Sequence, residues 1–141
     1  MKKKAYIKIK GLHAQQGLEG DDEIEVIYVG TCYSLNGKFY VKYMEEYDED
    51  DNIETMLVIS EDEVEIVCRG MRDSHMVFIR GEKNLNCYNT PFGKLNLGID
   101  TYRLDVDITQ DGVVVDIDYG IEINMGSVSE SHVHVEVEVL K

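Results

Sequence analysis

Two charged residues, Glu45 and Arg69, are the first that could do chemistry in this chain. Glu45 follows Val41 and Tyr43 at two-residue spacing, so its carboxylate is expected on an apolar strand face. A carboxylate there needs a partner, because an unpaired buried charge is strongly unfavourable, and Arg69 could supply a bidentate pair. The alternative, which stays open at this point, is that both charges lie in water at the rim of the fold.

His132 and His134 form the second candidate site. In a strand, residues two apart point to the same side, so the two imidazoles could share a metal ion with Glu136. However, valines occupy every second position from Val133 to Val139 and need the buried side. The histidines therefore face solvent, where a flat strand surface rarely encloses an ion, and we predict neither a metal site nor a cofactor.

The acidic stretch at residues 45–52 has part of a calcium-binding pattern. Asp48, Asp50 and Asn52 have the spacing of the first three ligands of an EF-hand loop. Ile53 then replaces the glycine of the sharp turn, and Ile59 replaces the bidentate glutamate. This stretch is therefore predicted to be the solvated tip of a hairpin.

Tyrosine is the most frequent aromatic residue, with nine copies against three phenylalanines. A tyrosine combines an apolar ring with a polar hydroxyl, so an interior that carries Tyr43, Tyr88 and Tyr119 could hold one small amphipathic molecule. The alternative is a filled interior, in which these rings pack in the core and their hydroxyls reach the rim.

Most motifs of catalysis are absent from the sequence. It has no Ser-His-Asp set, no phosphate-binding loop and no zinc-type spacing of cysteine and histidine. Cys32, Cys68 and Cys87 are odd in number and widely spaced, so they are predicted to be reduced thiols that pack as small apolar residues. A hydrolase or isomerase would need Glu45 as its acid or base. The sequence therefore favours a protein that is not an enzyme.

Charge and hydropathy exclude other classes. The 141 residues carry a net charge of −14, which repels phosphate backbones and anionic lipids. No apolar run approaches the ~20 residues of a membrane span, and the lysines after Met1 are not followed by the apolar core of a signal peptide. We therefore expect a cytoplasmic protein with no nucleic-acid or membrane partner.

The elements that position these residues are strands, because apolar and polar residues alternate at every second position in almost every segment. The pairs Asn36-Gly37 and Asp111-Gly112 are typical of two-residue hairpin turns, so neighbouring strands are predicted to be antiparallel. The apolar positions change parity within Asp100 to Arg103, which predicts a β-bulge. The whole chain, 1–141, is predicted to be one all-β domain, an antiparallel meander of about eight to ten strands closed into a barrel. A β-sandwich is the alternative.

Two segments depart from the strand pattern. Thr90-Pro91-Phe92-Gly93 contains the only proline and matches a type I turn, which should lead from a short strand into a long one. Between Gly11 and Asp21 the alternation lapses around three glycines. We predict that this stretch is a mobile lid over one end of the barrel and that the proline turn is the rigid lip opposite it.

Several segments, in this order, resemble the YwiB-like family of small bacterial proteins, a domain of unknown function. They are Tyr43-Met44-Glu45, Cys68-Arg69-Gly70, Tyr88-Asn89-Thr90-Pro91-Phe92-Gly93, Thr101 and Tyr119. The resemblance spans nearly the whole chain, and its most specific part is the segment that contains Pro91. It implies a calycin-like, lipocalin-like β-barrel and no particular activity.

Together these observations predict a cytoplasmic barrel that binds a small amphipathic molecule in its interior. The residues predicted to contact the ligand are Tyr43, Glu45, Arg69, Tyr88, Thr90, Phe92 and Tyr119. The rival prediction is a structural or interaction module with a filled barrel, whose acidic faces or exposed strand edges meet a basic protein partner.

Overall fold

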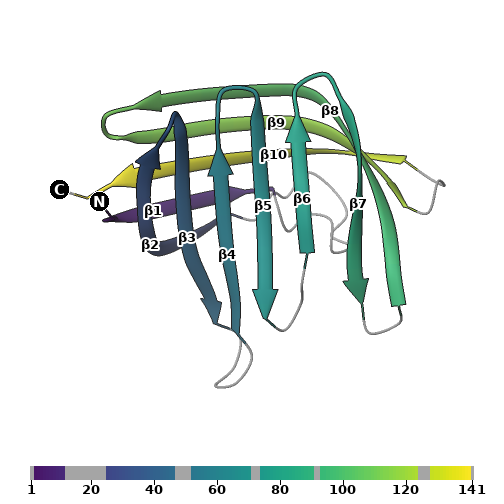
Figure 1. Ribbon diagram of the computed structural model, residues 1–141, viewed down its shortest axis with the longest axis horizontal. Helices are drawn as coiled ribbons and strands as arrows, with labels where there is room; N and C mark the ends of the chain where they lie inside the picture. Colours follow the sequence, from purple (N-terminus) through teal and green to yellow (C-terminus); the bar gives the residue numbers. More distant parts are fainter. Residues whose placement is uncertain are drawn as a thin grey trace.

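The computed structural model describes residues 2–11, 25–46, 52–70, 74–90, 93–123 and 128–140, which form an antiparallel β-barrel without helices (Figure 1). The strands in these residues are β1 (Lys3–Lys10), β2 (Glu25–Leu35), β3 (Lys38–Glu46), β4 (Asn52–Ile59), β5 (Glu63–Gly70), β6 (Ser74–Ile79), β7 (Lys83–Thr90), β8 (Gly93–Thr109), β9 (Gly112–Ile123) and β10 (Val128–Val139).

Each strand pairs with its neighbours in the sequence, and β1 also pairs with β10, which closes the sheet. Closure gives every strand two partners and hides the apolar face of the sheet inside the barrel. The predicted antiparallel meander closed into a barrel is therefore confirmed, and the alternative of two packed sheets is not formed.

Two-residue alternation decides which side chains enter the core. On β10, Val133, Val135 and Val137 are buried, whereas His132 and His134, at the alternate positions, are partly exposed on the outer face. Inward side chains of β1 to β6, β8 and β9 join those of β10 in one hydrophobic core. No helix in the described part of the chain is long and apolar enough to cross a bilayer.

The two predicted hairpin turns differ in detail. Asn36 and Gly37 both have positive φ, 52° and 79°, and connect β2 to β3 as predicted. The turn between β8 and β9 lies one residue earlier than predicted, because Thr109 already pairs with Gly112 and the turn residues are 110–111. Gly112 is needed for another reason: a Cβ atom there would lie 1.7 Å from the carbonyl oxygen of Val137.

A register shift between Thr101 and Arg103 confirms the predicted bulge in β8. It restores the inward face, since Ile99 before it and Leu104 after it are both buried. Ile108 shares the parity of Leu104 and is nevertheless 41% exposed. From the bulge onward β8 runs across the upper end of the barrel in Figure 1, so its last residues extend beyond the core.

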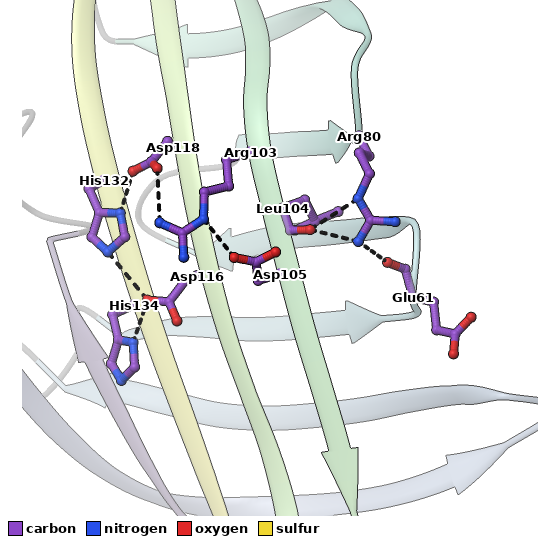
Figure 2. A network of polar contacts seen from close by, with 9 residues as sticks. All are labelled: Glu61, Arg80, Arg103, Leu104, Asp105, Asp116, Asp118, His132 and His134. Atoms are coloured by element: carbon purple, nitrogen blue, oxygen red, sulfur yellow. Dashed lines mark hydrogen bonds and ion pairs between the residues drawn. The ribbon is translucent and has the colours of Figure 1, made fainter.

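Arg80, which follows β6, connects the part of β8 after the bulge, residues 103–109, to the turn between β4 and β5. We call this part the outer half of β8. Its guanidinium donates two hydrogen bonds to the carbonyl oxygen of Leu104, at 2.6 and 3.1 Å (Figure 2). It also donates to the carbonyl oxygen of Glu61 at 3.0 Å and to the carboxylate of Asp62 at 2.9 Å. Arg80 thus satisfies a strand-edge carbonyl where no strand supplies a partner in the described residues.

The hairpin of β6 and β7 has the shortest pairing in the barrel, a single register pair between Ser74 and Tyr88. At its turn, the backbone of Gly81 and of Glu82 bonds to Thr101 of β8, at 3.3 and 3.1 Å. The turn itself is closed by one hydrogen bond, from the N–H of Glu82 to the carbonyl oxygen of Ile79 at 3.0 Å, and it is also fastened to β8.

Candidate functional site

Five of the seven predicted ligand-contacting residues lie at one end of the barrel. In Figure 1, β3, β5 and β7 all run toward the lower end of the barrel. Near that end β3 carries Tyr43 and Glu45, β5 carries Arg69, and β7 carries Tyr88 and Thr90. Strand register places the following residues as consecutive cross-strand partners: Tyr43, Thr55, Cys68, Ser74 and Tyr88. We call Tyr43, Thr55 and Cys68, whose side chains the structure describes, the polar row.

The polar row marks the boundary of the apolar core. Two residues deeper along the same three strands lie Val41, Leu57 and Ile66, each at most 2% exposed. Two residues further out lie Glu45, Ile53 and Gly70. The interior thus changes from aliphatic to polar within one step along the strands.

The hydroxyl of Tyr43 is the unsatisfied polar group of this row. Tyr43 is 2% exposed, its ring stacks on that of Tyr28 with centroids 4.4 Å apart, and its hydroxyl has no hydrogen-bond partner among the described residues. The buried Thr55 instead contacts Cys68, with 3.5 Å between Oγ1 and Sγ. Leaving a buried hydroxyl unpaired costs about 1–3 kcal/mol, so a bound molecule that pairs with it would gain affinity there.

Burial raises the pKa of the Tyr43 phenol well above its usual value. The negative charge of Glu45 and the neighbouring groups of Tyr28 and Cys68 raise this pKa further. The side-chain hydroxyl of Thr55 lies close enough to oppose the shift, but it does not have the geometry of a regular hydrogen bond to Tyr43. Tyr43 therefore keeps its proton at neutral pH and can donate a hydrogen bond.

Glu45 and Arg69 lie on opposite faces of the sheet. Glu45 is 7% exposed on the inner face, and its cross-strand partner is Ile53. Arg69 is exposed on the outer face, opposite Glu54. The interior ion pair that the sequence suggested is therefore not formed, because the alternation of β5 turns Cys68 inward and Arg69 outward.

The remaining predicted residues divide into three cases. Tyr119 is fully buried away from the polar row, where its ring meets Phe78 edge-on at 4.9 Å. For Tyr88 and Thr90 the structure describes the backbone, which pairs with β8. Phe92 lies outside the described residues, as do Pro91 and most of the predicted lid at Gly11 to Asp21.

Sequence reasoning missed Tyr28, Thr55 and Cys68 as members of this site. Thr55 could have been found, because it is the polar residue in an inward run of Ile53, Leu57 and Ile59. Tyr28 and Cys68 carried no such signal: their place depends on which strands become neighbours. Both are partly exposed, so the polar row borders solvent. Cys32 and Cys68 are free thiols.

A second polar cluster, which we call the outer network, lies on the outer face of β8, β9 and β10 (Figure 2). Asp116 accepts contacts from both histidines, at 2.6 Å from His134 Nδ1 and 3.3 Å from His132 Nε2. His132 Nδ1 lies 2.5 Å from Asp118, and His134 Nε2 lies 3.0 Å from Glu136. Both ring nitrogens of His134 are therefore hydrogen-bonded, and His132 has one hydrogen bond, to Asp118, and one ion-pair contact, to Asp116.

Burial by itself would lower the pKa of His134. Its hydrogen bonds to Asp116 and Glu136 have the larger effect, and the pKa of His134 is raised. The bond from His134 holds the pKa of Glu136 below its usual value. In the part of the chain that the structure describes, no three His, Cys, Asp or Glu side chains are arranged to hold a metal ion. Asp48 and Asp50 of the acidic stretch lie outside the described residues.

Comparison with known proteins identifies the family. A family model described as a domain of unknown function, DUF1934, matches residues 7–135, and the chain belongs to this family. It is 29% identical over 126 residues to the uncharacterized beta-barrel protein YwiB of Bacillus subtilis strain 168, covering 87% of this chain and 86% of that protein. The crystal structure of the ywiB protein from Bacillus subtilis superposes with a TM-score of 0.78 at 22% identity, covering 99% of this chain and 94% of the other. The resemblance predicted from the motifs is confirmed.

Proposed function

We propose that the barrel binds a small amphipathic molecule at the end marked by the polar row. The observation that carries this proposal is the buried hydroxyl of Tyr43, which lacks a partner among the described residues beside the buried carboxylate of Glu45. A group of this kind is unfavourable in a finished core and favourable in a site that a ligand completes.

The layering of the interior supports an amphipathic ligand. An apolar portion would face the aliphatic layer of Val41, Leu57 and Ile66, and a polar group would remain at the polar row. The Tyr43 hydroxyl would donate to an acceptor on the ligand, such as a carbonyl or hydroxyl oxygen. A neutral ligand fits better than an anion, because Glu45 lies close by.

The proposal is tested with Nile red, a neutral amphipathic dye whose fluorescence reports an apolar environment. We expect the wild-type protein to bind it, and Tyr43→Phe, which removes only the hydroxyl, to weaken binding about threefold to tenfold. Tyr33→Phe is the matched control, because Tyr33 stacks on Tyr40 at 4.8 Å, away from Tyr43 and Tyr28. It should leave the affinity unchanged.

A protein that binds no dye, or a Tyr43→Phe variant that binds it equally well, would favour the rival reading of a filled barrel. Native mass spectrometry of protein purified from its own host is the independent check, since a retained small mass supports the binder. We further propose a cytoplasmic location, supported by the reduced thiols of Cys32 and Cys68 and tested by fractionation of the host.

A further inference from the structure

The outer half of β8 has a free strand edge at the end of the barrel opposite the polar row. Backbone groups point alternately to the two edges of a strand, and Arg80 bonds to Leu104 on the edge away from β9. The N–H and C=O groups of Val106 and Ile108 therefore point to that same edge. In the described residues β7 pairs with β8 only as far as Asp100, so no strand covers this edge.

A groove of 530 Å³ lies beside this edge. Ile108 lines it together with Phe39 and with the turns at Gly37 and Ser60. Ile108 is 41% exposed, and Leu35 near the same turn is 53% exposed. An unpaired edge next to an apolar groove is the combination that proteins use to bind an extended peptide as an added strand.

The charges around the groove define the chemistry of the peptide. The two nearby arginines are already engaged, since Arg80 bonds to Asp62 and Arg103 bonds to Asp105. The exposed carboxylates of Glu61 and Asp107 lie beside the edge, and the positive charge on the groove wall is that of Lys38. Together with the net charge of −14, this favours a basic segment over an acidic one.

We propose that this edge and groove bind an extended basic peptide segment of a partner protein, which adds a strand to β8. The peptide backbone pairs with Val106 and Ile108, an apolar side chain enters the groove beside Ile108 and Phe39, and lysine or arginine side chains reach Glu61 and Asp107. This binding does not depend on the proposed ligand site, which lies at the opposite end of the barrel.

The test uses a capped eight-residue peptide of alternating lysine and valine. By NMR, we expect it to bind the wild-type protein and to slow hydrogen exchange at the amides of Val106 and Ile108. Ile108→Pro removes one edge N–H without touching the pairs with β9, and should weaken binding about tenfold. A peptide of the same sequence with alternate N-methyl groups should bind the wild-type protein no more tightly than the unmethylated peptide binds Ile108→Pro. Because this comparison uses the wild-type protein, it does not depend on correct folding of the variant.

Charge is tested separately by reversing Glu61 and Asp107 to lysine, which should abolish binding. The matched control reverses Glu46 and Glu130, which are exposed on β3 and β10, and should change the affinity less than twofold. Three results would overturn the proposal: no binding at about 1 mM peptide, equal binding of the N-methylated peptide, or equal losses in the two charge-reversed variants. The last two would indicate charge attraction without strand pairing.

Discussion

The barrel has two clusters of polar side chains, and they differ in how far their hydrogen bonds are satisfied. In the outer network, both nitrogens of His132 and of His134 contact carboxylates, although water is close. In the polar row, the Tyr43 hydroxyl is almost completely buried and has no partner among the described residues. The two histidines are therefore paired where water could have served them, whereas the Tyr43 hydroxyl is unpaired where water cannot reach it.

This difference indicates different roles. A paired network on a sheet surface joins neighbouring strands and contributes modestly to stability. An unpaired hydroxyl in the interior lowers stability, and in the proposed function a bound ligand would supply its missing partner. Substitutions in the two clusters should therefore separate stability from binding.

The largest expected effect is that of Tyr43→Ala. The ring of Tyr43 packs on Tyr28 inside the barrel, so its removal leaves a cavity and should lower the free energy of unfolding by about 3–5 kcal/mol. Tyr43→Phe keeps the ring and should leave stability unchanged or raise it slightly, because the lost hydroxyl had no partner. Urea denaturation measures both. A large loss of stability in Tyr43→Phe would mean that the hydroxyl is structural.

A smaller effect is expected for Asp116→Asn in the outer network. Asp116 contacts both His132 and His134, so the loss of its charge weakens two contacts with little change of shape. The site is partly exposed, which limits the loss in unfolding free energy to about 1 kcal/mol. Dye binding should not change, and a coupled loss of binding would contradict the separation of the two clusters.

The sequence predicted the barrel because alternation is a local property. The run from Val133 to Val139 identifies its own buried face, and the parity change before Leu104 identifies the bulge without knowledge of any partner strand. Register is not local in this way. That Thr55 stands beside Tyr43 and Cys68 depends on the lengths of the intervening turns, which the pattern fixes only to within a residue or two.

The same limit explains the errors at the site. Arg69 was predicted as a possible partner for Glu45 because a carboxylate on an apolar face needs one, but Glu45 lies on the inner face of the sheet and Arg69 on the outer face. Ile108 has the parity of the core, yet the bend at the bulge carries it beyond the barrel end. No sequence pattern predicts how far the outer half of β8 extends beyond the core, or that Arg80 contacts Leu104.

The smallest expected effect is the contribution of His134 and Glu136, in the outer network, to the dependence of stability on pH. The pKa of His134 is raised above 6.5, so the stability that its charged form contributes is fully present below about pH 6.5 and is lost as the pH rises through the folded-state value. The pKa of Glu136 is lowered from 4.5, so its contribution is present above about pH 4.5 and is lost as the pH falls through its folded-state value.

The network should therefore stabilise the protein most between about pH 4.5 and 6.5 and less toward pH 8. His134→Gln should flatten the decline in unfolding free energy between about pH 6 and 8, as measured by urea denaturation across that range. Tyr43→Phe should keep the wild-type slope, because Tyr43 is uncharged throughout this window. If His134→Gln keeps the full slope, the titrating group lies elsewhere and the outer network is not the source of the pH dependence.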